Sequence, residues 1–376
     1  MSFRRIVAFV FSGQLLREMK CLLEIRKLNK NLIVFYCAGW IDEVYVRSSI
    51  DCCINLGLNV ILITSDEERR ETVPERSVKR YTLSARFLKH TKASIFVTSS
   101  TGIDPNCFPS HAHEIIHIPH SLVSMNLVYH PGAFDAFTRF FVCGQYQEDE
   151  IRELDLLAGR EERYFHLMGY GKSDLMPTYC ADWSIEKGLV MIAPSWGKDG
   201  FIETIAESTI SALLKAGYRV CLRPHPRYMK KSVHLLENLT DVFSCNDNFV
   251  FENPMFISEM MDKAEILISD YSGAAFEYVF SKRRPAIFID LPLKNNNPHF
   301  DNSTNVPVEI AWRHKVGLIV PPSPTHIVEA VSTLKKQKVE GDFAIDEIRQ
   351  ELRWDGRCGE RIADWLKSIV NTKAVL

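Results

Sequence analysis

Residues 264–290 read AEILISDYSGAAFEYVFSKRRPAIFID, and this stretch decides the fold. A largely apolar run, Ile266–Ser269, stops at Asp270, and small residues follow it. A segment of helix length, Ala274–Phe280, leads to a second apolar run, Ala286–Ile289. The runs are continuous and do not alternate with polar residues, which is typical of parallel strands covered by helices on both faces.

The same alternation of strand-length and helix-length segments runs through the whole chain. In the first half we predict strands at Ile6–Phe11, Leu32–Tyr36, Val60–Thr64, Ser94–Thr98, Glu114–Ile118 and Phe137–Cys143, and helices at Gln14–Leu28, Val46–Leu56 and Arg76–His90. In the second half we predict strands at Leu189–Ala193, Arg219–Leu222, Phe249–Phe251, Ile266–Ser269, Ala286–Ile289 and Gly317–Val320. The predicted helices there are Ile202–Ala216, Arg227–Asn238, Phe256–Lys263, Ala274–Phe280, Pro324–Lys335 and Gly359–Ile369.

These segments predict an α/β fold with two doubly wound, Rossmann-like domains that face a cleft. The length of 376 residues also favours two domains, because it exceeds what one hydrophobic core usually serves. We place one domain at residues 1–175 and the second at 176–376. The last helices could fold back across the cleft.

The amino-acid composition indicates which partners and which cellular compartment to expect for this protein. The formal net charge is −2, so the overall balance gives no reason to expect nucleic acid as a partner. Ten scattered cysteines without a C-x-x-C pair suit a reducing compartment. The N-terminal apolar run, Ile6–Phe11, is too short to span a membrane, so we interpret it as a buried strand. We therefore expect a cytoplasmic protein, with peripheral association at the inner membrane face left open.

The residues after Ile266–Ser269 have the pattern of a phosphate site. In a parallel sheet, strand ends and helix N-termini face the ligand crevice, and a helix N-terminus attracts phosphate. Asp270 ends the strand, Ser272 adds a hydroxyl, and Gly273 lets a phosphate approach the backbone. Glu277 could reach a ribose or sugar hydroxyl. Ordinary helix capping explains Asp270 and Ser272 equally well, and Glu277 could be a solvated helix residue.

A second unusual segment, LRPHPR at 222–227, also follows a predicted strand. Pro224 and Pro226 restrict the backbone and so aim the imidazole of His225. A positively charged His225 with Arg223 would neutralise charge on a leaving diphosphate. The alternative is a rigid turn that carries an exposed histidine.

Four histidines lie within ten residues at 111–120. In an extended segment His111, His113 and His117 would share a face, which raises the possibility of a zinc site. No Asp-His or Cys pair completes a familiar pattern, so we expect neither metal nor cofactor. His120, at the end of a predicted strand, is a candidate general base, and a structural histidine is the default for each of the four.

One further turn, APSWG at 193–197, closes the first predicted strand of the second half. Trp196 could line a cleft, with Ser195 as a hydrogen-bond donor. A large core residue is the alternative interpretation of Trp196.

The order of these motifs resembles the CDP-glycerol glycerophosphotransferase family, the teichoic-acid polymerase and primase type, which is related in fold to GT-B glycosyltransferases. Here A-P-S-W is followed by L-R-P-H-P, I-S-D-Y-S-G-x-x-F-E-Y and R-P-A-I-F, whereas the family pattern looks like A-P-T-W, R-x-H-P, D-Y-S-S and K-P-x-x-F. The turn Gly169–Asp174 resembles the family's G-Y-P-R-x-D, and Asp355-Gly356 resembles a C-terminal D-G. The similarity covers about residues 110–370 and is strongest over 189–290.

The resemblance implies roles for matching positions. His225 would contact the donor's diphosphate, Ser272 and Gly273 would bind phosphate, and Glu277 would stand at the family's acidic position. His120 is similar to the family's proposed base in the first domain.

Three positions depart from the family pattern. The family usually has W-H-G-T where this chain has P-H-S-L at 119–122, a second serine where Gly273 stands, and an arginine where Gly197 follows A-P-S-W. The donor therefore stays open between CDP-glycerol, CDP-ribitol and a nucleotide sugar.

Motifs and resemblance together predict a transferase that moves a polyol-phosphate from a CDP-activated donor to a hydroxyl of a surface-polymer or glycan acceptor. Three alternatives stay open: a GT-B glycosyltransferase that uses a nucleotide sugar, an enzyme similar to nucleotide-sugar 2-epimerases, and a nucleotide-binding scaffold without catalysis.

Overall fold

The computed structural model describes residues 13–28, 31–66, 78–130, 132–176, 185–255, 258–295, 297–298, 300, 303–336 and 343–373. The strand predicted at Ile6–Phe11 lies outside the described residues. The domain boundary predicted after residue 175 stays a prediction, since the description stops at 176 and resumes at 185. The N-terminal half comprises residues 13–176, and the C-terminal half comprises residues 185–336.

The N-terminal half is built on a parallel sheet with the strand order β3-β2-β1-β4-β5-β6-β7. The strands are β1 (Ile33–Cys37), β2 (Val60–Thr64), β3 (Lys79–Thr82), β4 (Ile95–Thr98), β5 (Glu114–His117), β6 (Arg139–Val142) and β7 (Tyr164–Leu167). Its helices are α2 (Gln14–Arg26), α3 (Arg47–Asn55), α4 (Met125–Val128) and α5 (Gln145–Leu157), with short 3-10 segments η1 (Trp40–Tyr45), η2 (Ala85–His90), η3 (Pro105–Cys107) and η4 (Gly171–Leu175).

The C-terminal half repeats this plan with the order β10-β9-β8-β11-β12-β13, again parallel. The strands are β8 (Glu186–Ile192), β9 (Arg219–Leu222), β10 (Phe249–Phe251), β11 (Ala264–Ser269), β12 (Ala286–Ile289) and β13 (Gly317–Val320). Its helices are α6 (Phe201–Thr204), α7 (Ala206–Lys215), α8 (Pro226–Lys231), α9 (Val233–Phe243), α10 (Met260–Lys263), α11 (Gly273–Lys282), α12 (Val308–Ala311), α13 (Arg313–Val316) and α14 (Pro324–Lys336), and α15 (Ile345–Glu351) and α16 (Cys358–Lys373) follow. None of the helices within these ranges is long and apolar enough to cross a membrane.

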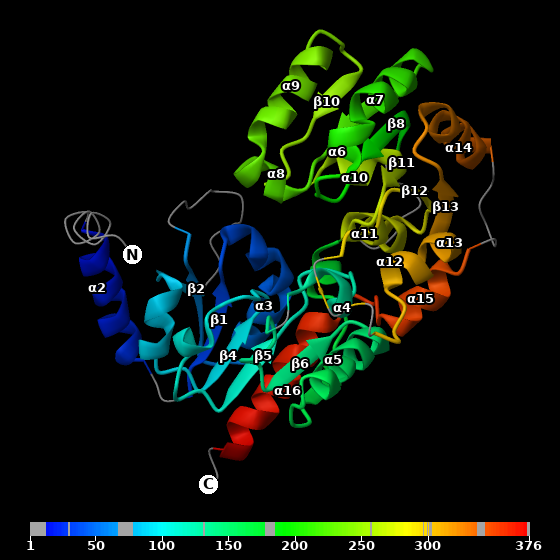
Figure 1. Cartoon of the computed structure of the whole chain (residues 1–376). Coiled ribbons are helices and arrows are strands. Elements are labelled where there is room, and N and C mark those ends of the chain that lie inside the picture. Colours follow the sequence, from blue (N-terminus) through cyan, green and yellow to red (C-terminus); the bar gives the residue numbers. More distant parts are fainter. Residues whose placement is uncertain are drawn as a thin grey trace.

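The two sheets confirm the predicted α/β class, with helices on both sides of each sheet (Figure 1). Every residue of β1 and of β12 is buried, which explains the continuous apolar runs. The helix predicted at Arg76–His90 is wrong. Its described part holds strand β3 and the 3-10 segment η2 instead, because β3 lies at the edge of the sheet and buries Tyr81 while exposing Lys79.

The C-terminal helix α16 packs on the N-terminal half (Figure 1). Its apolar residues Ile362 and Leu366 share a buried cluster with Phe35 of β1. The carboxylate of Asp174 accepts hydrogen bonds from the backbone N–H groups of Cys358 and Gly359, at 3.1 and 2.7 Å, and so caps the first turn of α16. The chain therefore returns to its first sheet after completing the second.

A segment of the C-terminal half also docks directly against the N-terminal half. The carboxylate of Glu309 accepts from the backbone N–H of Ser124 at 3.1 Å, and the Ser124 hydroxyl accepts from the N–H of Val308 at 2.8 Å. Nearby, the amide of Asn297 donates to the carbonyl of Asn126 at 2.7 Å. These contacts hold the loop after β5 against the C-terminal half, next to the cleft.

Candidate functional site

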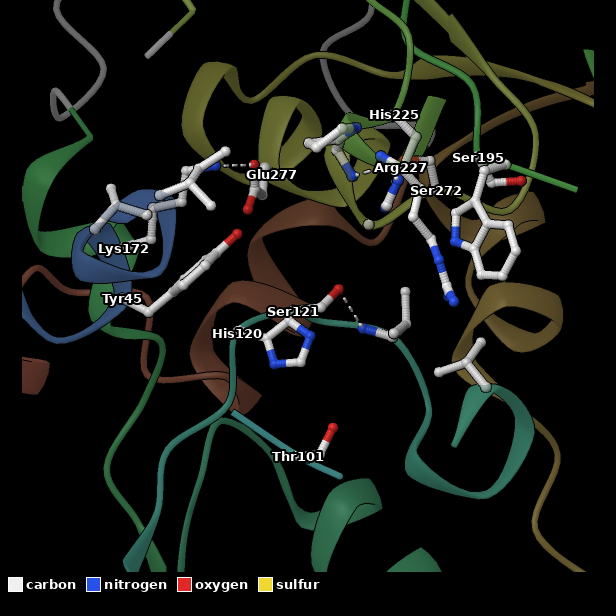
Figure 2. A pocket seen from close by; sticks show the side chains of 18 of the residues that line it. Tyr45, Thr101, His120, Ser121, Lys172, Ser195, His225, Arg227, Ser272 and Glu277 are labelled. Atoms are coloured by element: carbon white, nitrogen blue, oxygen red, sulfur yellow. Dashed lines mark hydrogen bonds and ion pairs between the residues drawn. The ribbon is translucent and has the colours of Figure 1, made fainter. Parts of the chain in front are cut away.

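A cavity of about 1220 Å³ lies between the two halves. Its walls come from loops that follow β1, β4 and β5 on one side and β8, β9 and β11 on the other. These are the carboxyl ends of parallel strands, and β1/β4 and β8/β11 are the pairs at which the strand order reverses. Open α/β sheets bind their ligands at such switch points. Figure 2 shows His120 and Ser121 on one wall, with His225, Arg227 and Ser272 facing them.

Asp270 does not line this cavity but supports its wall. Its side chain is 2% exposed and accepts hydrogen bonds from the backbone N–H and the hydroxyl of Ser195, at 2.7 and 2.9 Å. It also accepts from the N–H of Tyr271 at 2.7 Å. Burial raises the pKa of Asp270. The carboxylate thus ties the turn after β8 to the turn after β11, and Ser195 is the member of the pair that reaches the cavity.

Ser272 and Gly273 stand at the start of α11. The hydroxyl of Ser272 accepts from the N–H of Ala274 at 3.3 Å, which is ordinary N-capping, and Ser272 also lines the cavity. Gly273 touches the opposite wall. A Cβ atom at this position would lie 2.5 Å from the hydroxyl oxygen of Ser121 and 3.4 Å from the side chain of Val123. Glycine here lets the start of α11 meet the N-terminal half.

His225 is held by its own backbone. It caps α8, and its Nδ1 accepts from the N–H of Arg227 at 3.2 Å, so the ring proton of the neutral form lies on Nε2. Burial, together with the charges of Lys294 and Arg227, lowers the pKa of His225 to about 3. The lowered pKa favours a neutral His225 that donates through Nε2 over the positively charged side chain expected from the sequence.

Trp196 serves as a platform for two cations. The Nζ of Lys294 lies 2.9 Å from the centre of its ring, and the guanidinium carbon of Arg227 lies 3.6 Å from it. All three side chains line the cavity. Among the described residues, neither Lys294 nor Arg227 forms an ion pair with a carboxylate. An aromatic ring flanked by unneutralised cations is a setting suited to an anionic ligand.

The guanidinium of Arg223 already has ion-pair and hydrogen-bond partners within the protein. It pairs with Glu252 at 2.9 Å and donates to the carbonyls of Asn253 and Pro254, at 3.3 and 3.2 Å. It still borders the cavity, yet its charge is largely balanced by Glu252. The positive charge that the sequence placed on Arg223 is thus supplied at this wall by Arg227 and Lys294.

Glu277 already has partners on both carboxylate oxygens. It accepts from the hydroxyl of Tyr170 at 2.5 Å. It also accepts from Nζ of Lys172 at 2.6 Å (Figure 2). Both partners come from the turn Gly169–Asp174 of the N-terminal half. The structure thus uses Glu277 as a bridge between the halves, and a ligand hydroxyl would have to compete with Tyr170 or Lys172 for it.

His120 has the opposite tautomer from His225. Its Nδ1 lies 2.9 Å from the carbonyl oxygen of Ser99, which can only accept, so Nδ1 carries the proton. Its Nε2 lies 3.4 Å from the hydroxyl of Tyr129, a weak contact. The lone pair of Nε2 is therefore available at the cavity wall, as a general base requires.

The histidine cluster at 111–120 does not converge. His111 and His113 are exposed, whereas His117 is buried against Phe134 and Phe137, and burial lowers its pKa to about 3. Within the described ranges, no group of three His, Cys, Asp or Glu side chains could hold a metal ion.

Several cavity residues were not found from the sequence. Lys294 lies in the loop after β12 and Tyr45 in η1, and neither segment carries a motif for a ligand. Lys172, in η4, belongs to the turn Gly169–Asp174, which the sequence singled out without assigning it a ligand. Ser121 was noted only as a departure from the family pattern. The one available signal for Lys294 was its place just after a predicted strand, at the same sheet edge as the recognised motifs.

A protein-family model matches a segment of the C-terminal half. Residues 181–295 match the model of the family described as CDP-Glycerol:Poly(glycerophosphate) glycerophosphotransferase. The predicted resemblance is confirmed for this segment. The match contains the turns after β8, β9, β11 and β12, which carry Trp196, His225, Ser272 and Lys294.

Part of the chain is similar in sequence to a curated protein, and nearly all of it aligns with a solved structure. The teichoic acid ribitol-phosphate primase of Bacillus spizizenii is 31% identical over 173 residues, which cover 44% of this chain and 38% of the primase. The chain thus spans less than half the length of that relative. Among solved structures, the wall teichoic acid polymerase TagF aligns over 99% of this chain and 98% of its own, with a TM-score of 0.64 at 17% identity.

The fold is also shared with enzymes of another kind. A UDP-GlcNAc 2-epimerase from Methanocaldococcus jannaschii aligns over 90% of this chain and 99% of its own, with a TM-score of 0.57 at 14% identity. At such identities the likeness shows the fold alone. The predicted GT-B-like class is thereby confirmed, and function has to be argued from the site.

Proposed function

We propose that this protein transfers a polyol-phosphate from a CDP-linked donor to a hydroxyl group of a polymer or glycan acceptor. One observation carries the proposal: the cavity places His120, whose Nε2 has only a long contact of 3.4 Å with the Tyr129 hydroxyl, on the wall opposite His225, Arg227 and Lys294. The family match over 181–295 supports a nucleotide-linked donor on the side of the cations.

The geometry suits an in-line displacement at phosphorus. The acceptor oxygen forms a bond to the phosphorus that bears the polyol, and the bond from that phosphorus to the bridging oxygen breaks, so CMP leaves. The Nε2 of His120 takes the proton of the acceptor hydroxyl. The leaving phosphate gains negative charge, which His225 Nε2–H and Arg227 stabilise.

Thermal-shift measurements test whether the protein binds a CDP-linked donor. CDP-glycerol, CDP-ribitol and CMP should raise the melting temperature in proportion to the logarithm of their concentration, because a ligand that binds only the folded state stabilises it. UDP-sugars and GDP-sugars, offered at equal concentrations, should give smaller shifts. A larger shift with a nucleotide sugar would move the assignment to glycosyl transfer or epimerisation.

The variant Arg227→Ala tests whether the nucleotide binds in this cavity. Removing this unneutralised cation should reduce the CDP-glycerol shift. Arg152→Ala should leave the shift unchanged, because Arg152 is a partly buried residue of α5 that pairs with Glu148 and Glu162 and does not line the cavity. Equal shifts for both variants would mean that the nucleotide binds elsewhere. Incubation with donor alone separates the remaining alternatives, because an epimerase forms an isomer without acceptor and a scaffold forms nothing.

A further inference from the structure

The space next to Gly197 is filled by a side chain from a distant part of the chain. Gly197 ends the A-P-S-W-G turn after β8, and the Cδ atom of Lys294 lies 3.6 Å from the point that a Cβ of residue 197 would occupy. From there the lysine reaches over Trp196, with its Nζ 2.9 Å from the ring centre. A side chain at 197 would share this space with Lys294.

The position of Lys294 is electrostatically unfavourable without an anion. It is partly buried, and among the described residues the Asp270 carboxylate attracts it without forming an ion pair. Burial and the neighbouring charge of Arg227 lower its pKa to about 7. Other cations at the cavity differ: Lys172 is paired with Glu277, and Arg223 with Glu252. A bound phosphate would offset both the desolvation of Lys294 and its repulsion by Arg227.

We propose that Lys294, from the loop after β12, binds the donor's diphosphate beside Trp196 and Arg227. The inference rests on the proposed function and adds a binding residue to it.

A purely structural role is the competing explanation, because a lysine stem can simply cover an aromatic ring. The chain provides a matched control. Lys335 of α14 also places its Nζ over an aromatic ring, 5.2 Å from the centre of Tyr218, and it lies outside the cavity. Both lysines cover a ring, and only Lys294 is next to His225 and Arg227.

The test measures binding of CDP-glycerol, CMP and cytidine by calorimetry. Lys294→Ala should weaken CDP-glycerol and CMP binding about tenfold or more, the loss expected for one charge-assisted hydrogen bond. Cytidine, which has no phosphate, should bind to this variant as to the wild type. Lys294→Arg should retain most of the affinity, and Lys335→Ala should change none of the three. In the transfer reaction the effect of Lys294→Ala should appear in KM more than in kcat.

The inference is overturned if Lys294→Ala binds CMP like the wild type, or loses affinity for cytidine by the same factor. If the wild-type protein binds none of the cytidine nucleotides, the proposed function fails and this inference fails with it.

Discussion

The two histidines of the cavity differ in the nitrogen that carries the proton. The Nδ1 of His120 donates to a carbonyl, which leaves Nε2 as an acceptor, whereas the Nδ1 of His225 accepts from a backbone N–H, which leaves Nε2–H as a donor. The sequence predicted the place of both residues but not these states. Sequence spacing does not show which backbone groups a ring will meet, and the states follow from those contacts.

The neutral state of His225 leads to a prediction. Because its pKa is lowered to about 3, we expect its role to be that of a hydrogen-bond donor and not of a cation. His225→Gln keeps an N–H near the position of Nε2 and should retain more activity than His225→Ala, whose kcat should fall about 100-fold or more. Steady-state transfer kinetics measure both. Equal losses for Gln and Ala, at unchanged stability, would contradict the donor role.

Among the elements, the strands that the sequence predicted best are short apolar runs with clear ends. Strands β2, β9, β10, β12 and β13 have the predicted bounds, and β10 keeps them although its residues are only partly buried. Strand β3 was missed because it lies at the sheet edge and begins with Lys79 and Arg80. The loop that carries Lys294 has no periodicity at all, so its place over Trp196 depends on how β8 and β12 bring their ends together.

The start of α11 and the loop after β5 form a second testable contact. Gly273→Ala would place a methyl group 2.5 Å from the Ser121 hydroxyl, so we expect the free energy of unfolding to fall by about 1–3 kcal/mol, or the cleft to widen and transfer to slow. Ser121→Gly should remove most of that loss when combined with Gly273→Ala. A double-mutant cycle on urea unfolding and on transfer rate measures the coupling. Strictly additive effects would show that the two residues do not meet.

At the scale of the whole molecule, the halves are joined by buried polar contacts that the sequence did not indicate. Glu277 is shared with Tyr170 and Lys172, and Glu309 holds the loop at Ser124. Each half of the candidate site could be predicted from residues that follow strands. The contacts between residues of the two halves could not be predicted, because they depend on how the two sheets are oriented relative to each other.

A buried carboxyl beside this interface makes stability depend on pH. Glu150 is 1% exposed and accepts from the N–H of Met125 at 2.6 Å, and burial together with Glu309 raises its pKa to about 8. Between the ordinary value and about 8, the folded protein keeps a proton that the unfolded chain releases, so this group's contribution to stability falls as pH rises. We expect Glu150→Gln to reduce the loss of unfolding free energy between pH 6 and pH 8.5. Urea unfolding at both values measures it, and an equal loss in the variant would contradict the assignment.

Transfer of a polyol-phosphate with His120 as base is distinguished from other reactions by the leaving group that it releases. With CDP-glycerol as donor and poly(glycerophosphate) as acceptor, we expect CMP to be released in equal amount to the phosphodiester formed. His120→Ala should lower the rate about 100-fold or more, and His113→Ala, at an exposed histidine, should not lower it. Release of CDP in place of CMP, or an unchanged rate in His120→Ala, would contradict the account.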